Sequence, residues 1–100
     1  MAVEHIVIMK LRESLTEQQL AALCRDCEAH FEKIPGVLSA SMGANIHPSQ
    51  SGFTHAIVIR LEHSNALASY LRHPEHVAAG KRLSSVFADF VIIDLQTDES

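Results

Sequence analysis

A tyrosine and two histidines lie close together in the stretch Tyr70-Leu71-Arg72-His73-Pro74-Glu75-His76. Proline can begin a helix but cannot continue one, so we predict a break at His73-Pro74, between a helix over residues 64–71 and another over 74–86. His76 then lies in the first turn of the second helix, where the positive end of the helix dipole disfavours imidazolium. This position favours a neutral imidazole that can accept a proton. The alternative is a helix–helix corner whose histidines only cap and pack.

Cys24 and Cys27 form a C-x-x-C pair, a spacing that some redox and zinc sites use. A redox pair of this kind sits at a helix N-terminus, and a zinc site needs further ligands at matching spacing. Here the pair falls in the middle of a predicted helix, on its apolar side. Both thiols are therefore predicted to be reduced and buried.

Hydrophobic periodicity predicts the elements that position these side chains. Residues 3–11 alternate as a strand does, and Thr16 to Gln19 match a capping box that starts a helix, which Pro35-Gly36 stops. The remaining segments are predicted in the order strand 37–44, loop 45–52, strand 53–61, helices 64–71 and 74–86, and strand 90–95. This order is typical of an α+β, ferredoxin-like sandwich, with a four-stranded antiparallel sheet and the helices on one face.

That topology predicts which polar side chains meet. The first strand lies between the third and fourth and is antiparallel to both, so His5, near its start, lies beside Asp94, near the end of the last strand. A carboxylate in an apolar strand needs a partner. We therefore expect His5 and Asp94 to share one end of the sheet.

The length and composition of the chain limit the classes of function that it can have. One hundred residues make one small domain, expected over residues 1–97 and followed by a frayed tail at 98–100. The net charge is −4 and no basic cluster is present, which argues against nucleic acid and anionic membranes and favours a small neutral or weakly acidic ligand. Neither a signal-peptide pattern nor an apolar run of bilayer-spanning length is found, so a cytoplasmic location is expected.

The face of the sheet that the helices leave uncovered is predicted to be apolar. An antiparallel sheet with one wet side should carry polar residues there. A patch of this kind exceeds what a monomer usually exposes, so we expect a two-fold homodimer with its sheets packed face to face as a barrel. The residues that alternate onto this face are Ile6, Ile8, Ala56, Val58, Val91, Ile93 and Leu95.

Several of these segments together resemble the stress-responsive dimeric α/β-barrel (Dabb) family over nearly the whole chain. The matching segments are Val3-Glu4-His5-Ile6-Val7, Ile34-Pro35-Gly36-Val37, Gly52-Phe53-Thr54-His55, Tyr70 to Val77, and Val91-Ile92-Ile93-Asp94. The family contains uncharacterised members as well as plant polyketide cyclases. In those cyclases the second histidine of the His-Pro-x-His motif is the general base, and the tyrosine before the motif assists. The resemblance therefore implies catalytic roles for His76 and Tyr70, with His5, His55 and Asp94 around them.

The expected pocket lies between the helices and the sheet, with Asp94 or His5 within hydrogen-bonding reach of His76. Leu23, Cys24 and Cys27 stand where the cyclases have aromatic residues, and Ala79 stands where they have a phenylalanine, so a different ligand is expected. Besides these four residues, the expected walls are Val7, Met9, His55, Ile57, Ile59, Phe90 and Ile92.

Two functions remain open. One is a cyclase, lyase or isomerase that needs no cofactor and removes a proton next to a carbonyl, with the tyrosine hydroxyl bonded to the developing enolate. The other is a non-catalytic stress or small-molecule-binding dimer in which the same polar groups satisfy one another. A third interpretation is a dimeric-barrel monooxygenase, but no residue of the sequence favours it over the other two.

No metal is predicted. A transition-metal site built from His5, His73, His76 and Asp94 is disfavoured because Pro74 interrupts the helix between the last two histidines. Some plant members of the family bind a divalent cation through backbone carbonyls, here near Phe31, Ile34 and Val37, but such ligands leave no side-chain signature.

Overall fold

The computed structural model describes residues 1–47 and 51–97. Positions 48–50 of the predicted loop, and the predicted tail at 98–100, lie outside the described residues. None of the helices in the described ranges is long and apolar enough to cross a membrane. The elements are β1 (Val3–Leu11), α1 (Glu17–Glu32), β2 (Val37–Ala44), β3 (His55–Leu61), α2 (Ala66–Arg72), α3 (Pro74–Val86) and β4 (Phe87–Gln96).

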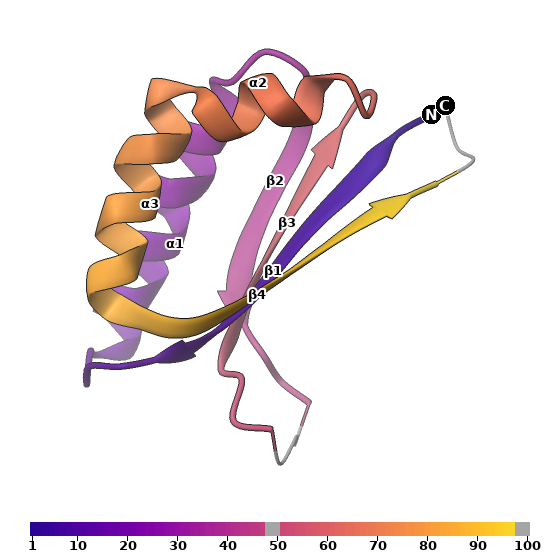
Figure 1. The fold of residues 1–100 in the computed structure, drawn as a ribbon. Coiled ribbons are helices and arrows are strands. Elements are labelled where there is room, and N and C mark those ends of the chain that lie inside the picture. Colours follow the sequence, from indigo (N-terminus) through magenta and orange to yellow (C-terminus); the bar gives the residue numbers. More distant parts are fainter. Residues whose placement is uncertain (48–50, 98–100) are drawn as a thin grey trace.

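The strands form one antiparallel four-stranded sheet in the order β2-β3-β1-β4. All three helices lie on one face of it (Figure 1). The chain therefore has the predicted ferredoxin-like α+β fold, with β1 between β3 and β4. Strands β1 and β2 and helix α3 have the predicted bounds, whereas β3 starts at His55 rather than at residue 53 and α2 spans Ala66–Arg72 rather than residues 64–71.

Helix α1 begins at the predicted capping box. The Thr16 hydroxyl accepts a hydrogen bond from Gln19 N at 3.1 Å, and the Gln19 side chain accepts one from Thr16 N at 2.9 Å. Two of the amide groups that a helix N-terminus leaves unpaired are thus satisfied. After the helix, Gly36 has φ 91°, a left-handed conformation that glycine adopts without a steric penalty.

Strand β4 starts earlier than predicted, at Phe87 instead of Phe90, because the sequence did not reveal a β-bulge. The pairing with β1 shifts between Ile8 and Lys10, and Asp89 has φ 57°. Aspartate tolerates this left-handed conformation better than most residues. The extra residue puts both Phe87 and Phe90 on the helix side, where Phe87 is buried in the core and Phe90 borders a cavity.

The core lies between the helices and the sheet. Cys24 and Cys27 contribute to it as free thiols, as predicted, together with the apolar residues of β1 and β3 that face the helices. The most completely buried large side chains are those of Tyr70, Phe87, Met9, Ile59, Leu61 and Cys27.

The two edge strands of the sheet differ. At β2, side chains of α1 bond the backbone of Met42: Glu28 Oε2 accepts from its N–H at 2.8 Å, and Arg25 Nη2 donates to its carbonyl at 2.9 Å. Arg25 and Glu28 also pair with each other. At β4, by contrast, Val91, Ile93 and Leu95 are exposed apolar side chains.

Candidate functional site

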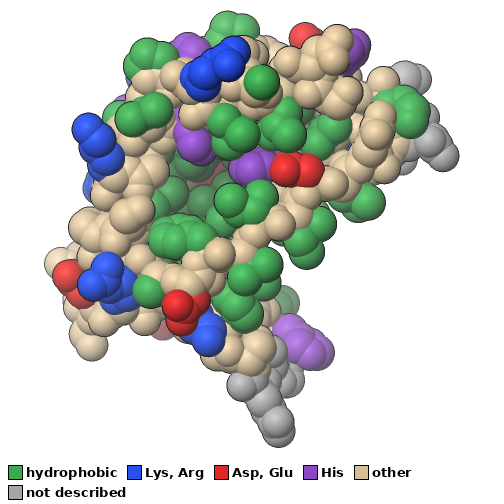
Figure 2. Space-filling model, in the orientation of Figure 1, with side chains coloured by type: hydrophobic (Ala, Val, Ile, Leu, Met, Phe, Trp, Pro, Cys, Tyr) green, Lys and Arg blue, Asp and Glu red, His purple; other side chains and the backbone are tan. Residues whose placement is uncertain are grey.

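A cavity of about 190 Å³ lies between the helices and the sheet. In the view of Figure 2 the surface is hollowed between the helices and β4, with hydrophobic and histidine side chains around the hollow. Its position follows from the fold, because α2, α3 and the end of α1 form one side and the strands β1, β3 and β4 the other. The lining residues are His5, Val7, Phe31, Ile57, Tyr70, Leu71, His76, Gly80, Leu83, Ser84, Phe90 and Ile92.

His76 lies in the first turn of α3, as predicted. Pro74 is the first residue of this helix, and the side chain of its N-cap His73 accepts a hydrogen bond from Glu75 N at 3.1 Å. His76 Nδ1 lies 2.9 Å from the carbonyl oxygen of Leu71. A carbonyl can only accept, so Nδ1 carries the proton and Nε2 is the basic nitrogen.

The environment of His76 favours its neutral form. Burial lowers its pKa from the ordinary value of 6.5, the hydrogen bond to Leu71 works in the opposite direction, and the nearby His5 lowers it further. The imidazole is therefore neutral at pH 7. A neutral ring that already donates from Nδ1 can accept a proton at Nε2.

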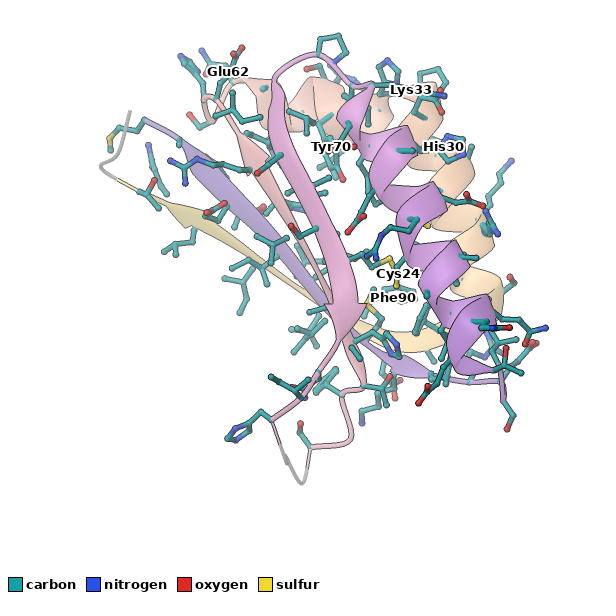
Figure 3. All side chains as sticks on the ribbon, turned by 180° about the vertical axis from the view of Figure 1, so that it is seen from behind. Cys24, His30, Lys33, Glu62, Tyr70 and Phe90 are labelled. Atoms are coloured by element: carbon teal, nitrogen blue, oxygen red, sulfur yellow. The ribbon has the colours of Figure 1, made fainter. Side chains whose placement is uncertain are left out.

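Tyr70 lies at the centre of a group of rings. Its ring centroid is 4.9 Å from that of His76, 5.4 Å from that of His5 and 6.2 Å from that of Phe31. Figure 3 shows it in the space between the helices and the sheet. Burial, and then the charge of Asp94, raise the pKa of the phenol, so it stays protonated as a hydrogen-bond donor. None of the hydrogen bonds found among the described residues uses its hydroxyl.

His5 and Asp94 are cross-strand partners, as the topology predicts. His5 Nδ1 lies 2.5 Å from Asp94 Oδ1, with His5 buried and the Asp94 carboxylate about a third exposed. The expected hydrogen bond from either of them to His76 is not formed among the described residues. Asp94 instead fixes the ring of His5, because the antiparallel register places these two residues opposite each other and Leu71 occupies Nδ1 of His76.

A family model described as the stress responsive A/B barrel domain, Dabb, matches residues 3–97. The chain belongs to the Dabb family. Among curated proteins it is similar to olivetolic acid cyclase from Cannabis sativa, with 25% identity over 96 residues that cover 94% of this chain and 95% of the relative.

Solved structures give the same fold. A dimeric ferredoxin-like protein of unknown function from Bacteroides fragilis is 26% identical, covers 96% of each chain and superposes with a TM-score of 0.73. A hydroxynitrile lyase from Passiflora edulis is 18% identical and superposes with a TM-score of 0.81, over 99% of this chain and 95% of its own. At that identity the likeness concerns the fold alone.

In this Dabb chain, four of the expected wall residues line the cavity, namely Val7, Ile57, Phe90 and Ile92. The others do not, because the cavity lies at the end of α1 that carries Phe31, away from the middle of that helix. Met9, Leu23, Cys27, Ile59 and Ala79 are instead packed in the core.

His55 and Cys24 border a different hollow, of about 330 Å³, between α1 and β2. The register explains this separation, since His55 pairs with Met9, several residues along β1 from His5. The His55 ring lies 5.1 Å from that of Phe87, and burial lowers its pKa. Burial also raises the pKa of both thiols, that of Cys27 to about 11, so the C-x-x-C pair is protonated.

Several residues of the site were not predicted: Phe31, Leu71, Gly80, Leu83 and Ser84. A signal for two of them was present in the sequence, because Gly80 and Ser84 follow His76 at steps of four residues and so share its face of α3. No signal revealed the role of the Leu71 carbonyl, which depends on the backbone conformation at the corner.

The side chains considered for a metal site take part in separate hydrogen bonds. His5 pairs with Asp94, His73 caps α3 and His76 bonds Leu71. Within residues 1–47 and 51–97 no group of three or more His, Cys, Asp or Glu side chains is arranged to hold a metal ion.

Proposed function

We propose that this Dabb protein binds a small carbonyl compound in the 190 Å³ cavity and removes a proton next to the carbonyl without a cofactor, as a cyclase, lyase or isomerase does. The observation that carries the proposal is the hydrogen bond from His76 Nδ1 to the Leu71 carbonyl. It leaves Nε2 as a base beside Tyr70 in a mainly apolar cavity. The similarity to a cyclase over nearly the whole chain supports the same class of chemistry.

The other residues take complementary roles in this proposal. His76 Nε2 takes the proton, and the electron pair of the broken C–H bond becomes part of an enolate. The Tyr70 hydroxyl, which stays protonated, donates a hydrogen bond to the enolate oxygen. His5, held by Asp94 at 2.5 Å, packs against the Tyr70 ring and fixes its position. His76 then returns the proton to carbon or to a leaving group.

Hydrogen exchange tests this proposal. Methyl naphthyl ketone, incubated with the protein in D₂O, should exchange its methyl hydrogens faster than in buffer. His76→Ala should reduce the rate to that of buffer, and Tyr70→Phe should reduce it by roughly a hundredfold, as removal of an enolate donor does. His63→Ala, at an exposed turn outside the cavity, should keep the wild-type rate. Exchange that persists in His76→Ala would contradict the assignment of the base.

A non-catalytic binding protein is the second candidate. The observation that favours it is that both histidines of the cavity already have a hydrogen-bond partner, His5 in Asp94 and His76 in the Leu71 carbonyl. The ketone would then raise the thermal midpoint of the protein without any exchange above buffer. Such a result would select binding over catalysis.

The proposal includes a homodimer through the open face of the sheet. Its predicted members Val58, Val91, Ile93 and Leu95 are all exposed in the single chain. A contiguous aliphatic surface of this kind on an antiparallel sheet is stabilised when it is covered. The similar chain from Bacteroides fragilis is described as dimeric, which supports the same assembly here.

A further inference from the structure

One face of α3 forms a continuous wall of the cavity. His76, Gly80 and Ser84 are spaced by four residues and all three line it. The wall therefore changes along the helix from an imidazole, through a position with no side chain, to a hydroxyl. His76 and Ser84 are separated by roughly 12 Å along the helix axis, at about 1.5 Å per residue.

Gly80 is not required by the packing of the chain itself. It lies in the interior of α3, where glycine is among the least favourable residues. It has no positive φ, and a Cβ added to it would meet nothing within 4 Å. The space that its missing side chain leaves belongs to the cavity, so a group from outside the chain can occupy it.

Ser84 offers a hydrogen-bonding group at the far end of this wall. Its carbonyl accepts from Arg12 Nη1 at 3.1 Å, but none of the hydrogen bonds found in the described part of the chain uses its hydroxyl. The side chain is exposed at the border of the cavity. The hydroxyl is therefore available to a ligand that extends away from His76.

The opposite wall is apolar. It consists of Val7 and Ile57 from the inner strands and of Phe90 and Ile92 from the edge strand β4. Phe90 and Ile92 are 39% and 56% exposed, so the cavity opens between them and α3. A ligand in this position contacts apolar groups on one side and the bare backbone at Gly80 on the other.

We propose that the ligand is a flat, mainly apolar ketone with a second hydrogen-bonding group at the end remote from its carbonyl. The carbonyl lies at His76 and Tyr70, the flat body crosses Gly80, and the remote group bonds the Ser84 hydroxyl. Gly80 then determines the thickness that the cavity accepts, and Ser84 is a positioning residue. This inference rests on the proposed function only in placing the carbonyl at His76.

Equilibrium binding tests it with two probes: methyl naphthyl ketone, and the same ketone with a hydroxyl at the far end of the ring system. We expect the hydroxylated ketone to bind the wild-type protein about tenfold more tightly, as one added hydrogen bond would give. Ser84→Ala should remove this preference, so that the two ketones bind the variant with equal affinity. Gly80→Val should weaken both ketones more than tenfold, and Gly80→Ala should weaken both by less.

Ala78→Val is the matched control, because Ala78 is exposed on the same helix and does not line the cavity. It adds the same kind of β-branched side chain and should leave both affinities unchanged. If Gly80→Val does not fold, the milder Gly80→Ala, which favours the helix, still tests the space. Equal affinities for wild type and Gly80→Ala, or an undiminished preference in Ser84→Ala, would overturn the inference.

Binding and exchange separate the two proposals. Variant-sensitive binding without hydrogen exchange would leave this inference standing and refute the catalytic proposal. Hydrogen exchange that depends on His76, together with ketone affinities that do not change in the Gly80 and Ser84 variants, would support the catalytic proposal and refute this inference.

Discussion

The imidazole of His76 is held in one tautomer by a main-chain carbonyl rather than by a carboxylate. A carboxylate partner would stabilise the charged ring, whereas the Leu71 carbonyl at 2.9 Å does so less strongly than burial opposes it. The ring therefore remains a weak base that is neutral at pH 7. Asp94 pairs with His5 instead, so the two histidines of the cavity have different hydrogen-bond partners.

This arrangement predicts how stability depends on pH. Burial lowers the pKa of His76 below 6.5, the value expected for the unfolded chain. Between the lowered pKa and 6.5 the unfolded state binds a proton that the folded state does not, so the free energy of unfolding rises with pH across this window. The wild-type protein should accordingly lose stability as the pH falls from about 7 to about 5.

Urea unfolding at both pH values measures this effect. His76→Gln should show a smaller loss than wild type, because glutamine does not titrate. The loss should not vanish, since burial also lowers the pKa of His55. An identical pH dependence in wild type and His76→Gln would show that His76 titrates alike in the folded and unfolded states.

For individual residues, the sequence predicted which residue types form the site and which residues are cross-strand neighbours, but it did not predict every contact. The pairing of His5 with Asp94 follows from strand order and alternation, and the structure confirms it. The partner of His76 does not follow from them, because a backbone carbonyl at a helix–helix corner has no sequence signature. The walls were predicted from alternation alone, which gives the face of a strand but not the position of a hollow along it.

Among the elements, the turn from α1 to β2 depends on one residue. Gly36 has φ 91°, and a Cβ at this position would lie 2.9 Å from Ala66 Cβ. The left-handed conformation alone costs about 1–2 kcal/mol for a residue with a side chain. Gly36→Ala should therefore lower the thermal midpoint by roughly 4–8 °C for each kcal/mol lost.

Gly43→Ala is the control for this prediction. Gly43 lies in β2 without a positive φ, and a Cβ there would meet nothing within 4 Å. Its thermal midpoint should stay close to that of wild type. A Gly36→Ala protein as stable as Gly43→Ala would mean that the turn relaxes without cost.

Element boundaries were predictable where the chemistry is local. Thr16 and Gln19 cap α1 and Pro74 begins α3, and these signals lie within a few residues of the boundary they set. The bulge at Asp89 is different, because it arises from the pairing of β4 with β1 across the whole sheet. Nothing in the residues around Asp89 distinguishes that position from a turn, so the start of β4 was placed too late.

At the scale of the whole molecule, the uncovered sheet face predicts the state of association. Sedimentation at micromolar concentration should give twice the 11.0 kDa mass of the chain. Ile93→Lys places a charge on the open face and should shift the protein to a monomer, because burying an unpaired charge is costly. Val77→Lys is the matched control on α3, with 45% exposure against 54% for Ile93, and should stay dimeric. A wild-type monomer would refute the assembly.

The bonds that Arg25 and Glu28 make to Met42 have a consequence for how far association can proceed. A sheet grows without limit only when both of its outer strands offer free amide and carbonyl groups to the next chain, as in fibrils. Here α1 supplies the partners that another strand would supply, because Glu28 Oε2 lies 2.8 Å from Met42 N and Arg25 Nη2 lies 2.9 Å from the Met42 carbonyl oxygen. A second strand therefore cannot pair with β2 at Met42. Strand addition is then left to the β4 side. The homodimer proposed above uses the face of the sheet and not its edges, so each chain keeps one edge for strand addition and a continuous sheet cannot run through more than two chains.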